Sequence, residues 1–262
     1  MTESDRRVLH VEGLAKSYGS RLIIADVSFY ADPREVVCIV GPSGAGKTTL
    51  LRCIAQLTQP SEGTVMLHGR VITSPPREMA VVFQDYSRSL MPWLKVSQNV
   101  GLPLKSMGLS REEREKRVAD AVSAVGLGDF LNHFPWQLSG GMQQRVAIAR
   151  ALAYGPEVLI MDEPFASVDA QTRAELEDLV LELRSNLGVT VVLVTHDIDE
   201  AVYMADRVVV LSGSPAQVTE SVDIPLGRKR DQILTKESPD FISNRSHVAR
   251  LIMNAKVSTR VS

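Results

Sequence analysis

The chain has 262 residues, long enough to bury a sizeable hydrophobic core in one large domain or in a domain with an insertion. Its 29 Lys and Arg nearly balance its 31 Asp and Glu, so no overall field attracts nucleic acid or an acidic membrane surface. The two cysteines, Cys38 and Cys53, lie in apolar stretches without a C-x-x-C pair, which indicates buried, reduced thiols in a cytosolic protein.

The amino terminus, residues 1–7, is polar and has no apolar h-region, so we expect no secretory signal. No apolar run in the sequence approaches the roughly 20 residues that span a bilayer. If the protein works at a membrane, another chain must hold it there.

Residues 8–14 and 22–30 mix apolar and polar side chains on either side of a turn at residues 18–20. This pattern predicts antiparallel strands with one solvated face. After a second turn at residues 32–35, residues 36–40 read Val-Val-Cys-Ile-Val. Such an unbroken apolar run is typical of a strand covered on both faces.

A glycine-rich loop follows this strand and fits the pattern G-x-x-x-x-G-K-[ST], with a helix-like run at residues 50–57 behind it. Glycines let the backbone wrap around a phosphate chain, and the following helix directs its positive end at the same anion. Lys47 would add a charge at the β- and γ-phosphates, and the Thr48 hydroxyl would contact Mg²⁺. An ordinary turn with a solvated lysine is disfavoured, because every fixed position of the pattern is matched between a predicted strand and a predicted helix. The loop consists of Gly41, Pro42, Ser43, Gly44, Ala45, Gly46, Lys47, Thr48 and Thr49.

Short strand signals at residues 65–67 and 80–83 precede a change of character at Gln84. A mostly helical insertion is predicted from there to about Tyr154. Ser110 and Glu113 form a capping box that opens a charged helix, which runs to about residue 125. The last helix of the insertion is expected to begin at Ser139 and to have one apolar face formed by Met142, Val146, Ala149 and Leu152.

Strand signals return in the second half of the chain, at residues 158–161, 189–194 and 207–211. Because a helix is expected between the first two, at residues 171–187, the order strand, helix, strand predicts a parallel sheet covered by helices. Beyond residue 213 apolar and polar residues alternate weakly, and a helix-like stretch follows at residues 241–253. The basic cluster at residues 228–230 is interpreted as a solvated face.

Three of the apolar strands end in residues with chemical function: Gly41 of the glycine-rich loop, the pair Asp162 and Glu163, and His196. Ligands of parallel sheets bind outside the carboxyl ends of the strands, so we expect these groups to meet at one edge. Asp162 fits the carboxylate that holds Mg²⁺, and Glu163 fits a group that orients a water and accepts its proton. His196 could donate a hydrogen bond to a γ-phosphate. The simpler alternatives are an acidic helix cap and a structural histidine.

The sequence LSGGMQQR at residues 138–145 closely resembles the LSGGQ signature of ATP-binding cassette proteins, with Met in the place of the first Gln. The resemblance extends over nearly the whole chain. It implies an α/β fold: a P-loop NTPase core with a mainly parallel sheet, an N-terminal antiparallel β subdomain and an inserted α-helical subdomain. We expect one domain over residues 1–262. Its parts are the core at residues 1–84 and 155–225, the helical subdomain at 85–154 and a C-terminal extension at 226–262.

The family pattern also assigns roles to single residues of this sequence. It implies that Tyr18 stacks on adenine, that residues 41–49 bind the ATP phosphates and that Asp169 belongs to the D-loop, in which Val168 is a small departure. The implied catalytic residues are Lys47, Gln84, Glu163 and His196. The implied Mg²⁺ ligands are Thr48, Gln84 and Asp162. The implied signature residues, which act on the ATP of a second copy, are Ser139, Gly140, Gly141 and Gln143.

A segment at residues 83–85, 90–96 and 99–100 resembles the ATPase subunits of nitrate, sulfonate and taurine-type bacterial importers. In that family the corresponding surface receives a short helix of a transmembrane permease subunit. The alternative is that Trp93 and Leu94 fill the core of the insertion. The resemblance thus implies a head-to-tail homodimer, permease subunits and, indirectly, a solute-binding protein as partners, with no nucleic acid.

The leading hypothesis is therefore a Mg²⁺-dependent ATPase subunit of an importer, held at the cytoplasmic face of the membrane by its permease. A soluble cassette ATPase of DNA repair or translation is disfavoured, because the chain lacks a second cassette, a long heptad insertion and a strongly basic face. A nucleotide switch that does not hydrolyse ATP is disfavoured because such a switch could dispense with Glu163. Nothing in the sequence distinguishes a sulfonate from nitrate as the transported solute.

Overall fold

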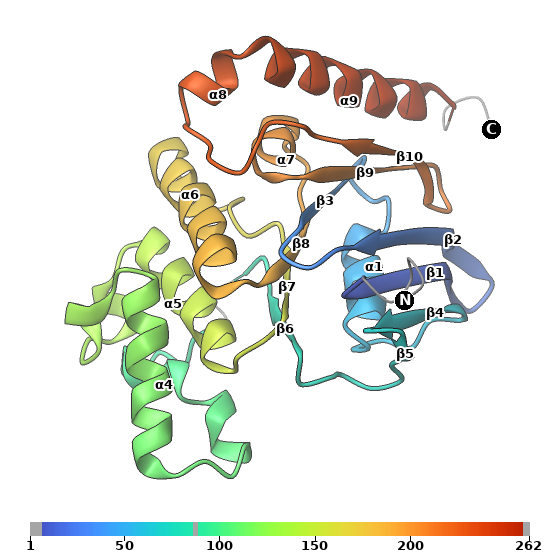
Figure 1. Cartoon of the computed structure of the whole chain (residues 1–262). Helices are drawn as coiled ribbons and strands as arrows, with labels where there is room; N and C mark the ends of the chain where they lie inside the picture. The colour runs from blue at the N-terminus through green and yellow to red at the C-terminus, as the bar shows by residue number, and fades with distance from the viewer. Residues whose placement is uncertain (1–6, 86–88, 259–262) are drawn as a thin grey trace.

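The computed structural model describes residues 7–85 and 89–258, and the prediction about the polar amino terminus falls almost entirely outside them. Two sheets and a set of helices make up the chain (Figure 1). The helices between β6 and β7 lie to one side of the sheets, and the C-terminal helices cover the opposite end. Within the described residues, no helix combines the length and the apolar character needed to cross a bilayer.

The larger sheet has six strands in the order β10-β9-β3-β8-β7-β6. Its five strands from β9 to β6 run parallel, and β10 pairs with β9 in the antiparallel direction. The bounds are β3 (Val36–Val40), β6 (Met79–Val82), β7 (Val158–Asp162), β8 (Thr190–Val194), β9 (Arg207–Ser212) and β10 (Gln217–Asp223). The predicted parallel sheet is confirmed, and each apolar strand signal of the second half of the chain corresponds to a strand.

The smaller sheet is antiparallel, with the order β2-β1-β4-β5. Its strands are β1 (Leu9–Tyr18), β2 (Arg21–Ala31), β4 (Glu62–Leu67) and β5 (Arg70–Val71). The predicted turn at residues 18–20 joins β1 and β2, where Tyr18 pairs with Arg21. The predicted antiparallel strands are therefore confirmed, and they extend a few residues further than the sequence pattern indicated.

The helices are distributed over both faces of the larger sheet. Those before the signature sequence are α1 (Lys47–Ile54), α3 (Val96–Val100) and α4 (Arg111–Ala124), with short 3₁₀ turns at Pro103–Ser106, Gly128–Phe130 and Pro135–Gln137. Those after it are α5 (Gly140–Ala153), α6 (Ala170–Leu187), α7 (Ile198–Met204), α8 (Leu234–Glu237) and α9 (Pro239–Ser258). The predicted capping box is present, since Ser110 Oγ accepts from Glu113 N and Glu113 Oε2 accepts from Ser110 N.

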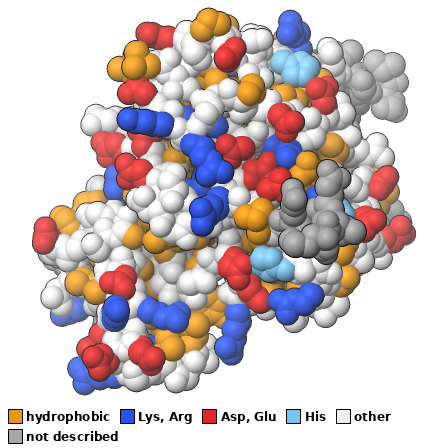
Figure 2. All heavy atoms as spheres, viewed as in Figure 1, with side chains coloured by type: hydrophobic (Ala, Val, Ile, Leu, Met, Phe, Trp, Pro, Cys, Tyr) orange, Lys and Arg blue, Asp and Glu red, His pale blue; other side chains and the backbone are white. Residues whose placement is uncertain are grey.

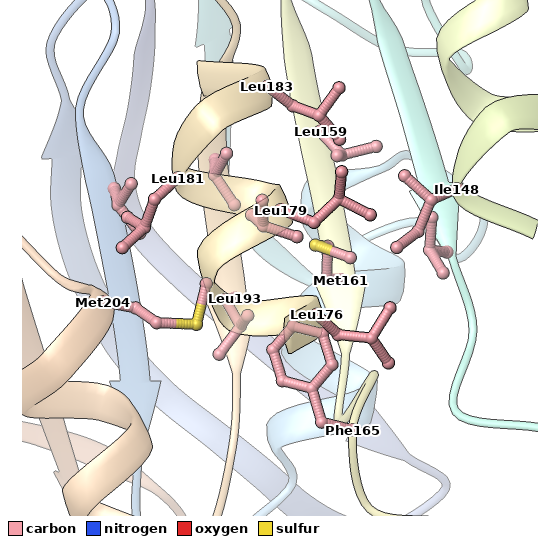
Figure 3. Packing of buried hydrophobic residues seen from close by; sticks show 14 of the residues in the cluster. Ile148, Leu159, Met161, Phe165, Leu176, Leu179, Leu181, Leu183, Leu193 and Met204 are labelled. Carbon is pink, nitrogen blue, oxygen red and sulfur yellow. The ribbon is translucent and has the colours of Figure 1, made fainter. Parts of the chain in front are cut away.

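The fully buried strand β3 separates two hydrophobic clusters, because successive side chains of a strand point to opposite faces. Val37 and Ile39 face the cluster that α1 and the smaller sheet complete, so that α1 lies between the two sheets. Val36, Cys38 and Val40 face the larger cluster, to which α4, α5, α6, α7 and α9 contribute. Figure 3 shows its centre, where leucines of α6 meet β7 and β8 and Met204 of α7. Helices α1 and α5 therefore pack on opposite faces of the larger sheet.

Two details correct the sequence predictions. Helix α1 begins at Lys47, three residues before the helix-like apolar run, because the loop itself supplies the first turn. The basic cluster at residues 228–230 is not a solvated face throughout: Arg228 and Lys229 are exposed, but the Arg230 side chain is 0% exposed. Its guanidinium donates to the carbonyls of Tyr203 and Ala205 at the end of α7, which a scan for charge clusters does not detect.

Candidate nucleotide site

The glycine-rich loop lies tightly between β3, β2 and β9. Gly46 has a φ of 78°, and a Cβ atom there would lie 2.8 Å from Ile23 Cγ2. At Gly41 a Cβ atom would lie 2.8 Å from the carbonyl oxygen of Leu211. By contrast, nothing lies within 4 Å of a Cβ on Gly44, which has a φ of 80°. The loop thus needs glycine at residues 41 and 46 because the chain packs closely there. It needs glycine at residues 44 and 46 because the backbone there is left-handed.

Lys47 is the first residue of α1, and its side chain is folded back over the loop. Its Nζ donates to the carbonyl oxygens of Gly41 at 2.9 Å and Pro42 at 3.0 Å. Burial lowers the pKa of Lys47, and the nearby Glu163 and Asp162 carboxylates oppose that effect. An ammonium group has three N–H donors, so one remains for an anion at the mouth of the loop.

Asp162 is the last residue of β7, and it is buried beside the first turn of α1. The Thr48 hydroxyl donates to Asp162 Oδ1 at 3.3 Å. Burial raises the pKa of Asp162, and the hydrogen bond from Thr48 counteracts the shift. A hydroxyl and a carboxylate oxygen side by side are the hard ligands that Mg²⁺ prefers, together with waters and substrate phosphates. No group of three or more His, Cys, Asp and Glu suited to a metal occurs among the described residues.

Glu163 receives hydrogen bonds from residues that follow two other strands. Gln84, after β6, donates from Nε2 to Glu163 Oε2 at 3.2 Å, and His196, after β8, lies 3.0 Å from the same oxygen through Nδ1. The Glu163 backbone has a φ of 44°, and its N–H donates to the carbonyl of Val194 at 2.8 Å. A non-glycine residue in the left-handed region costs free energy and is concentrated at functional sites. With 58% of its side chain exposed, His196 keeps its Nε2 edge open to a ligand.

Tyr18 ends β1 with 51% of its surface exposed, and Lys16 Nζ lies 5.1 Å from the centre of its ring. The ring is therefore available for a contact with a flat partner. The prediction that Tyr18 stacks on adenine stays a prediction.

The signature residues form the start of α5. Ser139 is the N-cap and its Oγ accepts from Met142 N at 3.3 Å, while Gln143 Nε2 donates to the carbonyls of Pro135 and Leu138. Ser139 and Gly140 are exposed. A Cβ on Gly141 would lie 2.3 Å from Thr172 Cγ2 of α6, so glycine is required there for helix packing. Asp169 is the N-cap of α6, accepting from Thr172 N at 3.0 Å.

The structure thus brings one group of the predicted residues together and leaves another apart. Lys47, Thr48, Asp162, Glu163, Gln84 and His196 meet at the carboxyl edge of the larger sheet. Residues 139–143 belong to a helix on the face of that sheet opposite to α1, and no hydrogen bond between them and the glycine-rich loop occurs in the part of the chain that the structure describes.

One contact near this edge was not predicted from the sequence. Arg173 of α6 donates from Nη1 to Asp197 Oδ2 at 3.0 Å, and Asp197 is the N-cap of α7, directly after His196. The ion pair joins the starts of the two helices that follow Asp169 and His196. An Asp between a strand end and an apolar helical run is a recognisable N-cap signal, and it could have indicated this residue.

A known protein family matches the part of the chain that contains the glycine-rich loop, the signature helix and the end of β7. The family described as ABC transporter matches residues 24–166, which is more than half of the chain. The chain belongs to the ABC transporter family. It is an ATP-binding, ATP-hydrolysing subunit of that family, and the resemblance seen in the sequence is confirmed.

Several curated ABC proteins are similar to this chain over most of their length. The taurine import ATP-binding protein TauB of Yersinia pseudotuberculosis is 40% identical over 92% of this chain and 95% of its own. The bicarbonate transport ATP-binding protein CmpD of Synechocystis is 38% identical over 97% of this chain and 93% of its own.

Solved ABC structures share the fold. CbiO1 of Clostridium perfringens, part of the ABC transporter complex CbiONQ, superposes with a TM-score of 0.79 at 26% identity, covering 98% of both chains. The ATP-binding cassette MJ0796, in a dimeric post-hydrolysis state bound to ADP and Pi, has a TM-score of 0.71 at 35% identity and covers 82% of this chain and 98% of its own. The predicted α/β P-loop fold is thereby confirmed.

Proposed function

We propose that the chain is the ATPase subunit of an importer that takes up a small solute of the nitrate, sulfonate or taurine type. The observation that carries the proposal is the meeting of Lys47, Asp162, Glu163 and His196 at one edge of the larger sheet. The names of the relatives, a taurine importer and a bicarbonate transporter, support transport over a soluble cassette ATPase outside transport.

In this proposal ATP lies along the glycine-rich loop. Backbone N–H groups of the glycine-rich loop and the positive end of α1 face the phosphates, and the third N–H donor of Lys47 reaches them. Tyr18, exposed at the end of β1, supplies the surface for adenine.

Hydrolysis of ATP needs a base for the attacking water, a hydrogen-bond donor to the γ-phosphate and a cation that offsets the negative charge on its oxygens. Glu163 orients the attacking water and takes its proton, and Gln84 and His196 hold its carboxylate in place until His196 turns Nε2 towards the γ-phosphate. Thr48, Asp162 and Gln84 would hold Mg²⁺, which neutralises charge that develops on the phosphate oxygens. The strained backbone of Glu163 fixes the base relative to the strand end.

A second copy of the chain completes the site. Ser139, Gly140, Gly141 and Gln143 define a helix start whose exposed N–H groups and positive dipole suit the γ-phosphate of another copy. The position of α5 on the face opposite to α1 supports a site shared between copies, as does the dimeric state of MJ0796. Asp169, at the start of the neighbouring helix α6, lies at the same interface. ATP then closes the pair of chains, and hydrolysis reopens it.

The membrane partner binds the surface that follows Gln84. Trp93 is 70% exposed, which is inconsistent with a role in filling the core of the helical insertion. Leu94 beside it is only half-buried, so the two side chains offer an apolar contact for a permease segment. The permease would hold the chain at the cytoplasmic face of the membrane and, through its other side, receive solute from a binding protein.

A substitution of the base tests the ATPase assignment. Glu163→Gln should bind Mg·ATP and lose at least about 10²-fold in turnover, because the amide cannot accept the proton of water. The variant should accumulate as a dimer in size-exclusion chromatography with light scattering. Lys47→Ala is the control that should neither bind ATP nor dimerise. Turnover by Glu163→Gln at the wild-type rate would remove Glu163 from its role.

Mixing two inactive variants tests whether the site is shared. Gly140→Asp places a carboxylate at the first position of α5, where a helix accepts it but a γ-phosphate does not. When this variant is mixed with Lys47→Ala, a shared site predicts that one of the two sites in each hybrid is intact and that ATPase activity returns. Sites contained within single chains predict no recovery.

Transport is tested with the membrane subunits of a taurine, nitrate or bicarbonate importer from the same organism. The chain should copurify with them and drive ATP-dependent uptake of taurine, nitrate or bicarbonate into vesicles, and Trp93→Ala should weaken copurification without lowering the ATPase activity of the isolated chain. Failure to copurify, or uptake that is independent of ATP, would contradict the importer assignment.

A further inference from the structure

The chain has two tryptophans, and the structure exposes both of them. Trp93 belongs to the surface assigned above to the permease, whereas Trp136, at 71% exposure, has no role in the proposed mechanism. Tryptophan is enriched at the centres of protein interfaces, where one side chain can contribute a large part of the binding free energy. The surroundings of Trp136 indicate which partner covers it.

Trp136 is held rigidly although it is exposed. Its ring is stacked on that of Phe134, with centroids 5.9 Å apart and planes 9° from parallel. Gln137 closes the turn below them, because its side-chain oxygen accepts from Phe134 N at 2.8 Å and its N–H donates to the Phe134 carbonyl at 2.9 Å. A rigid aromatic pair loses little conformational entropy on binding, which favours an interface anchor.

The aromatic pair is attached to the start of the signature helix. Gln143 of α5 donates to the carbonyls of Pro135 at 3.0 Å and Leu138 at 3.2 Å, so the turn with Trp136 and the helix start with Ser139 form one unit. Gln137, Ser139 and Gly140 are exposed beside Trp136. Residues 134–144 contain no charged side chain, so this surface loses little ionic solvation when a partner covers it.

We propose that Phe134 and Trp136 form the aromatic anchor of the surface by which the chain meets a second, ATP-loaded copy of itself. This inference rests on the shared-site dimer proposed above and assigns it a contact outside the signature motif. The surface around Trp136 is continuous with the helix start that faces the second copy's ATP. In that dimer the second copy's nucleotide lies beside its exposed Tyr18, and the face of an indole ring can stack against such a nucleotide.

The two tryptophans provide an experiment with an internal control. Trp93→Phe leaves Trp136 as the single fluorophore and Trp136→Phe leaves Trp93, both in the Glu163→Gln background that traps the closed state. On addition of Mg·ATP, the emission of Trp136 should shift to shorter wavelength and its quenching by acrylamide should fall several-fold. Trp93 should show neither change, because its proposed partner is absent.

A pair of alanine variants measures the contribution of the ring. Trp136→Ala should weaken the Mg·ATP-dependent dimer of the Glu163→Gln protein by about 10- to 100-fold, as loss of an interface anchor does. Trp93→Ala, which removes an equally exposed ring, should leave the dimer unchanged. Both variants should unfold at the wild-type temperature, since neither ring is part of the core.

Three other outcomes would overturn the inference. A dimer that forms while Trp136 stays accessible to acrylamide would refute the anchor and leave the shared site standing. A protein that binds ATP but never dimerises would refute the shared site and the anchor together. Protection of Trp136 only when membrane subunits are added would assign the aromatic pair to the permease instead.

Discussion

Two regions of this molecule gather acidic and basic side chains, and they use them differently. The first region is the proposed catalytic edge, called the catalytic edge below, and consists of Lys47, Gln84, Asp162, Glu163 and His196. The second region, here called the α6–α7 charge network, consists of Glu177, Arg184, Glu200, Asp206, Arg230 and Lys236. The face of the molecule drawn in Figure 2 mixes both signs of charge without a large patch of either.

The α6–α7 charge network is mostly paired within the protein, although Arg184 Nη2 and Glu200 Oε1 are buried without a hydrogen-bond partner among the described residues. Asp206 lies between two arginines, 3.0 Å from Arg184 of α6 and 3.6 Å from Arg230. Arg230 also donates to the carbonyls of Tyr203 and Ala205, and so it caps α7 at the end where a cation is favoured. Arg184 and Arg230 are almost fully enclosed. These charges serve to fasten helices together.

The C-terminal segment completes the network. Gln232 Nε2 donates to Glu177 Oε2 at 3.1 Å and Asp178 Oδ1 at 2.9 Å, and Lys236 Nζ lies 3.5 Å from Glu177 Oε2. Glu177 is buried on α6 and Glu200 on α7. The extension beyond β10 therefore supplies a cation and an amide donor to carboxylates of α6.

The two regions differ in how far their charged side chains are enclosed by protein, and not in how many charges they contain. At the catalytic edge Glu163 receives two hydrogen bonds on one oxygen and His196 remains largely exposed. Such groups can exchange partners when a nucleotide binds. In the network the arginines are surrounded by protein, so a lost partner would leave a buried charge or carbonyl unsatisfied.

The largest expected effect separates activity from stability at the catalytic edge. His196→Ala should lower the ATPase kcat by about 10²- to 10³-fold, as loss of one donor to a transition state does. The free energy of unfolding should change by less than about 0.5 kcal/mol, because the side chain is mostly exposed. Steady-state kinetics and urea unfolding measure the two quantities. A large loss of stability with a normal kcat would mean that His196 is a structural residue, which would contradict this prediction.

The converse effect is expected in the network. Arg230→Met keeps an apolar stem but removes the donors for two carbonyls and for Asp206, and it should lower the free energy of unfolding by about 3 kcal/mol. Lys229→Met, at the exposed neighbouring position, is the matched control and should change it by less than about 0.5 kcal/mol. Urea unfolding checks both. Equal effects of the two variants would mean that Arg230 is as dispensable as its neighbour.

The third expected effect is a pH dependence of stability. Burial, followed by Glu177 and Asp197, raises the pKa of Glu200 from 4.5 to about 8, against the opposing effects of Thr195 and Arg173. The folded chain holds this proton more tightly than the unfolded chain, so the contribution of Glu200 is fully present below pH 4.5 and is lost as pH rises towards 8. The loss amounts to at most about 1.4 kcal/mol per pH unit.

Glu200→Gln removes this titration and should flatten the fall of stability between pH 5 and pH 8, roughly the interval in which the unfolded and folded chains differ in protonation. Urea unfolding of both proteins across that range gives the difference directly. Identical slopes would show that Glu200 is ionised in the folded chain. Asp240→Asn, an exposed acid in the first turn of α9, serves as the control.

Much of the catalytic edge could be predicted because most of its residues lie close to the end of a strand in the sequence. The apolar run at residues 36–40, the glycines after it and the acids after Met161 each define a strand end by local pattern alone. Once the strands are parallel, the edge at which these ends meet is fixed. The helix start at Lys47 was placed three residues late, because apolar periodicity does not register a first turn built from the loop.

The amino-acid sequence by itself determined the phosphate loop, the alternation of strands and helices and the set of groups at the catalytic edge, because each depends on neighbours within a few residues. Only the tertiary structure decided that Arg230 is buried, that Gly141 must make room for Thr172, and that Phe134 and Trp136 stack in the open. Burial and contact depend on which distant elements pack together, and a charge or an aromatic ring has the same appearance in a sequence whether it is covered or exposed.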